Sequence, residues 1–120
     1  MDQARKTAQI FKILSVETRV RMVELLKTRS LCVNALAKNL NITPAAVSQH
    51  LRILREADVV IPEKRGYFVH YRIDEKTLRL WSERVENLLR PSPRKDMDSF
   101  LQENCTSGVI PPERSEATEE

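Results

Sequence analysis

The sequence predicts one mainly α-helical domain that carries a small β-hairpin. Apolar residues recur at helical spacing through most of the first ninety residues, two of these helical patterns are separated by only a short turn, and a β-prone segment with a glycine turn follows them. At 120 residues, 41% of them hydrophobic, the chain is large enough for one such domain with a modest core. We place this domain at residues 1–90 and a C-terminal extension at residues 91–120.

Three helices are expected before residue 41, each with an apolar stripe. The stripes consist of Ala4, Ala8 and Phe11 in the first helix, of Val16, Val20, Val23 and Leu26 in the second, and of Val33, Leu36, Ala37 and Leu40 in the third. Asn41 and Ile42 then supply a tight turn before a fourth helical pattern. The order of helix, tight turn and helix is that of a helix-turn-helix.

The fourth helix is expected to begin at Thr43 and Pro44. Thr43 can cap the free amides of the first turn, and a proline in the first position loses no hydrogen bond. One stripe is apolar and should be buried, namely Val47, Leu51 and Leu54, whereas the opposite face holds Ala45, Ser48, Gln49 and Arg52. Such a face suits a DNA major groove, which is about 12 Å wide; the alternative is an ordinary solvent-exposed helix face.

A β-hairpin should follow, with β-prone residues 59–61, a charged turn at residues 63–66 and an alternating strand at residues 67–73. Gly66 provides the positive φ that such a turn needs. In the second strand, alternation predicts that one set faces the domain, namely Tyr67, Val69, Tyr71 and Ile73, and that the other set lies on the outer surface, namely Phe68, His70 and Arg72. A helix-turn-helix with this hairpin makes a winged helix, and Lys64 and Arg65 near its tip could contact phosphates.

The last helix is expected to start after Asp74, a suitable cap, and to end before Pro91. Its apolar seam is broader than a terminal helix should leave exposed, and consists of Leu78, Trp81, Val85, Leu88 and Leu89. We therefore predict that the first and last helices pair with their copies in a second subunit; packing within one chain is the alternative. The residues expected at this dimer interface are Phe11, Leu78, Trp81, Val85 and Leu88.

Charge is unevenly distributed along the chain. Residues 1–90 hold 17 Lys and Arg against 10 Asp and Glu, a net charge of +7, whereas residues 111–120 hold one Arg and four Glu, a net charge of −3. A basic domain favours the sequence-independent part of DNA affinity. The extension has prolines at its start and an acidic end without apolar pattern, which predicts partial disorder.

Localisation follows from what the sequence lacks. No apolar run approaches a membrane span, the N-terminus has no signal-peptide core, and two cysteines are too few for a secreted disulfide scaffold. We therefore expect a cytoplasmic protein without a membrane partner.

Three segments carry a resemblance to a known family: LSVETRVRMVELL, LCVNALAKNLNITPAAVSQHLRILREADVV and KRGYFVHYRI. Together they resemble the ArsR/SmtB family of dimeric bacterial transcriptional repressors. The resemblance implies a homodimer that binds double-stranded operator DNA and releases it when a metal ion, metalloid or other thiol-reactive effector binds. We predict groove contacts by Ser48, Gln49 and Arg52, with supporting contacts by Thr43, Pro44, Ala45, His50, Lys64 and Arg65.

The two cysteines are the main indication of the effector. Arsenite-sensing relatives carry Cys-Val-Cys at the start of the third helix, whereas this segment reads Cys32-Val33-Asn34, so the first ligand matches and the second is missing. Soft ions favour thiolates, and trivalent arsenic in this family takes three ligands, so Cys32 would need Cys105 and a further ligand. Arsenite or antimonite is the first expectation, with no permanently bound cofactor. The alternatives are a redox- or persulfide-sensing repressor that bridges Cys32 and Cys105, and cysteines without a regulatory role.

Other functional classes are less well supported. The zinc and nickel sites of relatives use His and carboxylate pairs on the last helix, which has no histidine here, and His50 and His70 lack ligand partners at helical spacing. Two glycines provide no phosphate loop and no histidine adjoins a nucleophile and an acid, so we do not expect an enzyme. A winged helix that binds proteins without specific DNA binding is the alternative from another class.

Overall fold

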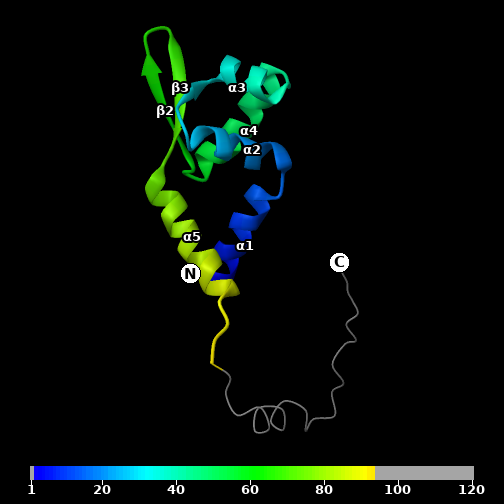
Figure 1. The fold of residues 1–120 in the computed structure, drawn as a ribbon, viewed down its shortest axis with the longest axis vertical. Helices are drawn as coiled ribbons and strands as arrows, with labels where there is room; N and C mark the ends of the chain where they lie inside the picture. The colour runs from blue at the N-terminus through cyan, green and yellow to red at the C-terminus, as the bar shows by residue number, and fades with distance from the viewer. Residues whose placement is uncertain (1, 94–120) are drawn as a thin grey trace. The chain divides into compact units, whose positions relative to one another are not determined.

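The computed structural model describes residues 2–93, and contacts group Met1–Arg90 into one compact unit. The elements of this unit are α1 (Gln3–Leu14), α2 (Glu17–Leu26), β1 (Leu31–Cys32), α3 (Val33–Leu40), α4 (Pro44–Glu56), β2 (Val60–Arg65), β3 (Phe68–Ile73) and α5 (Glu75–Leu89). Helices α1 and α5 lie side by side at one end, and α2, α3, α4 and the hairpin occupy the other end (Figure 1). The predicted winged helix-turn-helix is confirmed.

Local signals in the sequence set where α3 ends and where α4 begins. Thr43 Oγ1 accepts a hydrogen bond from the Ala46 amide at 3.1 Å, and Pro44 is the first residue of α4. Before it, Asn41 ends α3 in the left-handed conformation with φ of 58°, which asparagine tolerates better than most residues. The predicted cap of α5 is also present, because Asp74 Oδ1 accepts from the Lys76 amide at 3.1 Å.

The sheet has three antiparallel strands in the order β1-β3-β2 instead of the two that the sequence predicted. Strand β1 pairs Leu31 with Tyr71 and Cys32 with His70. A strand of two residues is too short to show an alternating pattern, so only the pairing with β3 reveals it.

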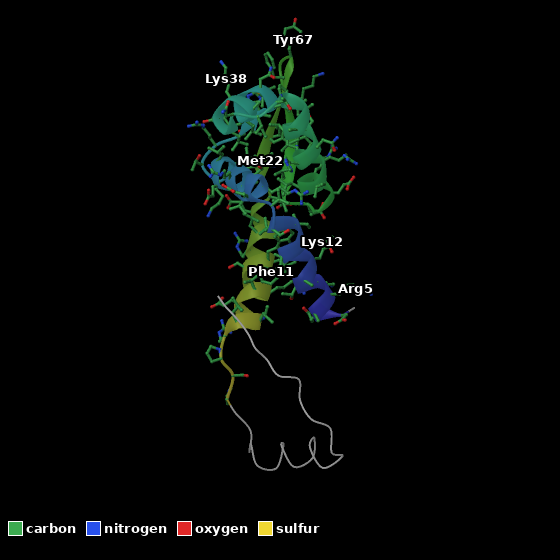
Figure 2. All side chains as sticks on the ribbon, turned by 90° about the vertical axis from the view of Figure 1, so that its right-hand side faces the viewer. Arg5, Phe11, Lys12, Met22, Lys38 and Tyr67 are labelled. Atoms are coloured by element: carbon green, nitrogen blue, oxygen red, sulfur yellow. The ribbon has the colours of Figure 1, made fainter. Side chains whose placement is uncertain are left out.

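The predicted position of the hairpin turn was wrong. Strand β2 continues through Arg65, which pairs with Phe68, so the turn consists of Gly66 and Tyr67. Gly66 has a φ of 64°, as expected, but the Tyr67 side chain is 99% exposed and does not face the domain. The hairpin projects beyond the helices, so none of the described residues covers its tip (Figure 2). Val69 is also exposed, whereas Tyr71 and Ile73 pack against the core as predicted.

The core lies between the helix-turn-helix and the inner face of the sheet. Its fully buried side chains are Met22, Leu36, Val47, Leu51, Leu54 and Val59. The stripe predicted for α2 was partly wrong, because Val20 is exposed and Met22, which the stripe left out, is buried (Figure 2). Helix α2 is covered by α3, α4 and β3, and the face turned towards them is the one with Met22 and Leu26. A flexible, unbranched methionine fills the space where these three elements meet.

Helix α5 differs from the other helices because it contributes no buried residue to this unit. It packs on α1, and the Arg84 guanidinium donates a hydrogen bond to the Gln3 side-chain oxygen across the pair. Among residues 2–93, no helix combines the length and the apolar character that crossing a membrane requires.

Candidate nucleic-acid interface

Helix α4 has the two faces that the sequence predicted. Val47, Leu51 and Leu54 are buried in the core. Ala45, Ser48, Gln49 and Arg52 are exposed, as are Thr43 and Pro44 at the start of the helix. The side chains proposed to read DNA therefore lie on one accessible face, held by the buried stripe behind them.

Two of these side chains are already ordered relative to each other. Arg52 Nη2 donates a hydrogen bond to Gln49 Oε1 at 3.1 Å, one turn apart on α4. Both groups are solvent-exposed, so this bond is weak and water or a base edge can replace it. Arginine can contact guanine with two hydrogen bonds and glutamine can contact adenine in the same way, so this pair has the chemistry for reading bases.

His50 lies between α4 and α2 and is only partly exposed. Its Nδ1 accepts a hydrogen bond from Arg19 Nε at 3.3 Å. Burial and then the nearby positive charge of Arg19 lower the pKa of His50 below its ordinary value. An imidazole whose Nδ1 accepts carries its proton on Nε2, which leaves one donor for a phosphate or a base. The contact with Arg19 could not be predicted from local sequence, because the two residues are 31 positions apart and no helical spacing relates them.

The wing carries its basic residues near the tip, in strand β2 instead of in the turn. Lys64 and Arg65 are both exposed. Glu63 accepts from Arg72 at 3.0 Å and from Arg65 at 3.4 Å, and the Arg72 hydrogen bond is the main reason that the pKa of Glu63 is lowered. This carboxylate offsets part of the positive charge and holds the two guanidinium groups beside one face of the hairpin.

Tyr67 is a candidate contact that sequence analysis assigned to the wrong environment. It follows Gly66 at the very tip of the wing (Figure 2). The signal that could have found it is the turn: a two-residue loop with glycine first places the next residue at the tip as well.

Cys32 is a free, half-buried cysteine at the N-cap of α3. Residues in register on neighbouring strands share a face, so Cys32, His70 and Glu63 form a row across β1, β3 and β2. His70 Nδ1 is buried and has no hydrogen-bond partner within residues 2–93. In that same part of the chain no three His, Cys, Asp or Glu side chains gather closely enough to hold a metal ion. Cys105 lies outside the described residues.

The α1–α5 pair presents an apolar face to solvent. Phe11 is 44% exposed and Leu88 is 58% exposed, and both line a groove of about 500 Å³ with Ala4 and Ala8. The remaining residues predicted for the interface are partly buried, namely Leu78, Trp81 and Val85, and the first two pack against the hydrophobic core. All five thus belong to one helical layer at the end of the unit away from the wing.

A helix-turn-helix with an accessible second helix and a basic wing defines a class: the winged helix-turn-helix transcriptional regulators, which bind DNA. The profile described as "bacterial regulatory protein, arsR family" matches residues 17–61, which cover α2 to the beginning of β2. A curated relative of which the matched region covers 94% supports the same family. The chain belongs to the ArsR/SmtB family and is a transcriptional repressor with a DNA-binding helix-turn-helix, not an enzyme.

Known proteins similar to this chain include the arsenical resistance operon repressor of Escherichia coli strain K12. The two are 31% identical over 110 residues, which cover 82% of this chain and 94% of the relative. A solved structure described as a "possible transcriptional regulator for arsenical resistance" is 29% identical, covers 92% of this chain and 99% of its own, and gives a TM-score of 0.58.

The homodimeric winged helix-turn-helix domain of Mb0332 from Mycobacterium bovis has the same fold. It is 22% identical, covers 79% of this chain and 88% of its own, and gives a TM-score of 0.57.

Proposed function

We propose that the protein is a homodimer that represses transcription by occupying operator DNA, and that a thiol-reactive effector acting at Cys32 releases it. The observation that supports operator binding is the exposed face of α4. Ser48, Gln49 and Arg52 are its groove residues; Thr43, Pro44, Ala45, His50, Lys64 and Arg65 are its supporting contacts. Lys64 and Arg65 extend the contacts beyond the groove that α4 enters, and Tyr67 joins them at the tip.

The dimer is proposed from the terminal helices. Within residues 2–93, helix α5 has no fully buried residue: Trp81 and Val85 are only partly buried and Leu88 is 58% exposed. A second copy of the chain would cover this apolar seam and so stabilise it. Two copies joined through α1 and α5 would present two α4 helices, which matches half-sites about one helical turn apart. The homodimeric state of the Mb0332 domain is consistent with this arrangement.

The dimer is tested by sedimentation equilibrium of Leu88→Glu. A carboxylate at this exposed position leaves the subunit core intact but places a charge in the seam, so we expect monomers. Val69→Glu is the matched control, because Val69 is similarly exposed but lies on the wing. A Leu88→Glu protein that remains dimeric would contradict the proposed interface.

Arsenite or antimonite is the effector we propose. Cys32 supplies a soft, half-exposed thiol at the position where α3 begins, and thiolates are the ligands that such ions favour. His70 lies in register beside it, and Cys105 and Asn34 are the other candidate ligands on this chain. The similar repressor of Escherichia coli strain K12 is named for arsenical resistance, which supports this choice of effector. Binding there would act on α3, which packs against the reading helix α4.

The test is fluorescence anisotropy of the reduced protein on DNA from its own promoter, titrated with arsenite. We expect tight binding with a steep salt dependence, release by arsenite, and loss of that release in Cys32→Ser. Cys105→Ser, measured alongside, reports whether the second cysteine takes part. Tight binding that ignores arsenite but responds to persulfide would favour a Cys32–Cys105 thiol sensor. Weak binding indifferent to sequence would favour a protein-interaction module.

A further inference from the structure

Arg19 links three helices through one side chain. It lies in the first turn of α2, where its Nη1 donates a hydrogen bond to the Ile13 carbonyl oxygen at 3.1 Å and its Nε donates to His50 Nδ1 at 3.3 Å. Ile13 belongs to the last turn of α1 and His50 to the middle of α4. Because the guanidinium is planar and rigid, the two bonds fix the direction of one acceptor relative to the other.

The contact with α1 satisfies a group that the helix itself leaves free. The last carbonyl groups of a helix have no partner within it, and a positive charge at this end is favourable. The Ile13 carbonyl is one of these groups. Arg19 therefore holds the end of α1 at the corner where the chain turns into α2.

The contact with α4 needs a neutral histidine. Nδ1 can accept from Arg19 only while it carries no proton, and burial together with Arg19 favours that state. The bond is partly buried, so solvent does not replace it as readily as it replaces the exposed bond of Arg52 to Gln49.

We propose that Arg19 is a positioning residue that sets the angle between the dimerising arm, α1, and the reading helix, α4. This inference rests on the proposed dimer: if α1 and α5 join the subunits, the angle between α1 and α4 determines the distance between the two α4 helices. Successive base pairs are about 3.4 Å apart, so a change of a few ångströms equals one base pair of half-site spacing. Arg19 thereby determines which spacing the dimer accepts.

The test measures affinity for operators whose half-sites are moved one base pair closer or farther apart. Arg19→Met keeps the length of the side chain but removes both donors. Arg21→Met is the matched control, because Arg21 lies on the same helix, loses the same charge, and is paired only with the exposed Glu17 among the described residues. Sedimentation equilibrium and binding to non-operator DNA are measured for each variant.

We expect Arg19→Met to bind the native spacing about tenfold more weakly than Arg21→Met and to bind the altered spacings nearly as well as the native one. Dimerisation and non-operator binding should be equal in the two variants. A merely structural loss would weaken all spacings alike. An unchanged spacing preference in Arg19→Met would overturn the proposal.

Substitutions of His50 provide a second, independent test of the same proposal. His50→Asn keeps an acceptor at the position of Nδ1 and should keep the spacing preference, whereas His50→Leu removes it and should lose the preference. Equal preferences in these two variants would also overturn the proposal. Failure of the unchanged protein to dimerise or to bind its operator would instead contradict the proposed function.

Discussion

Arg52 and Gln49 are hydrogen-bonded to each other on the exposed face of α4, with 3.1 Å between Arg52 Nη2 and Gln49 Oε1. The bond joins two side chains that are both solvent-exposed, so it is weak and a base edge can replace it at little cost. A base edge that replaces the bond meets two side chains that lie together on the exposed face of α4.

Arg52→Ala is expected to weaken operator binding by about 1 to 3 kcal/mol if Arg52 contacts a base, and less if it contacts only phosphate. Fluorescence anisotropy against the operator and against single-base variants of it separates the two cases. Arg55→Ala removes the same charge from the last turn of the helix and should reduce affinity less and without base preference. Equal affinity of Arg52→Ala and the unchanged protein would remove Arg52 from the interface.

Thr43→Ala should destabilise the protein by about 1 kcal/mol, because it removes the side-chain oxygen that accepts from the Ala46 amide. Urea denaturation at fixed protein concentration measures this loss. Thr43→Ser keeps the hydroxyl and should restore most of the stability. If serine and alanine were equally destabilising, the cap would not be the cause.

Gly66→Ala should also lower the free energy of unfolding by about 1 kcal/mol, because alanine disfavours a positive φ. Gly66 has a φ of 64°, and a Cβ there would meet no atom within 4 Å, so no steric clash contributes. Urea denaturation again provides the measurement, and Lys64→Ala, an exposed substitution beside the turn, should change stability little. A neutral Gly66→Ala would mean that the turn rearranges at no cost.

The stability of the protein should decrease as the pH falls below about 6.5, in part because of His50. Burial and Arg19 lower the pKa of His50 in the folded protein, so between its ordinary value and that lower value only the unfolded chain takes up the proton. Proton uptake by the unfolded chain reduces the free energy of unfolding through this range and has no effect well above it. Denaturation between pH 8 and pH 5 should show a smaller decrease for His50→Asn, which does not titrate. Identical pH profiles would mean that the native environment of His50 does not resist protonation.

Local patterns predicted the parts of the fold that depend on neighbouring residues. The Thr43–Pro44 start of α4, its buried stripe and the cap at Asp74 were all predicted, because capping and helical spacing act within a few residues. Strand β1, the two-residue turn and the burial of Met22 were not, because each depends on what a distant segment places beside it.

By itself, the sequence determined the helical order, the exposed and buried faces of α4 and the family to which the chain belongs. Only the tertiary structure decided which separate segments come into contact. Arg19 hydrogen-bonds to His50 and to the end of α1, and Cys32 pairs in register with His70. The tertiary structure also decided that Tyr67 is exposed to solvent at the wing tip. The physical reason is range. Hydrogen-bonding and steric preferences along the chain extend over about one helical turn, whereas these long-range contacts depend on how the helices and the sheet pack around a shared core.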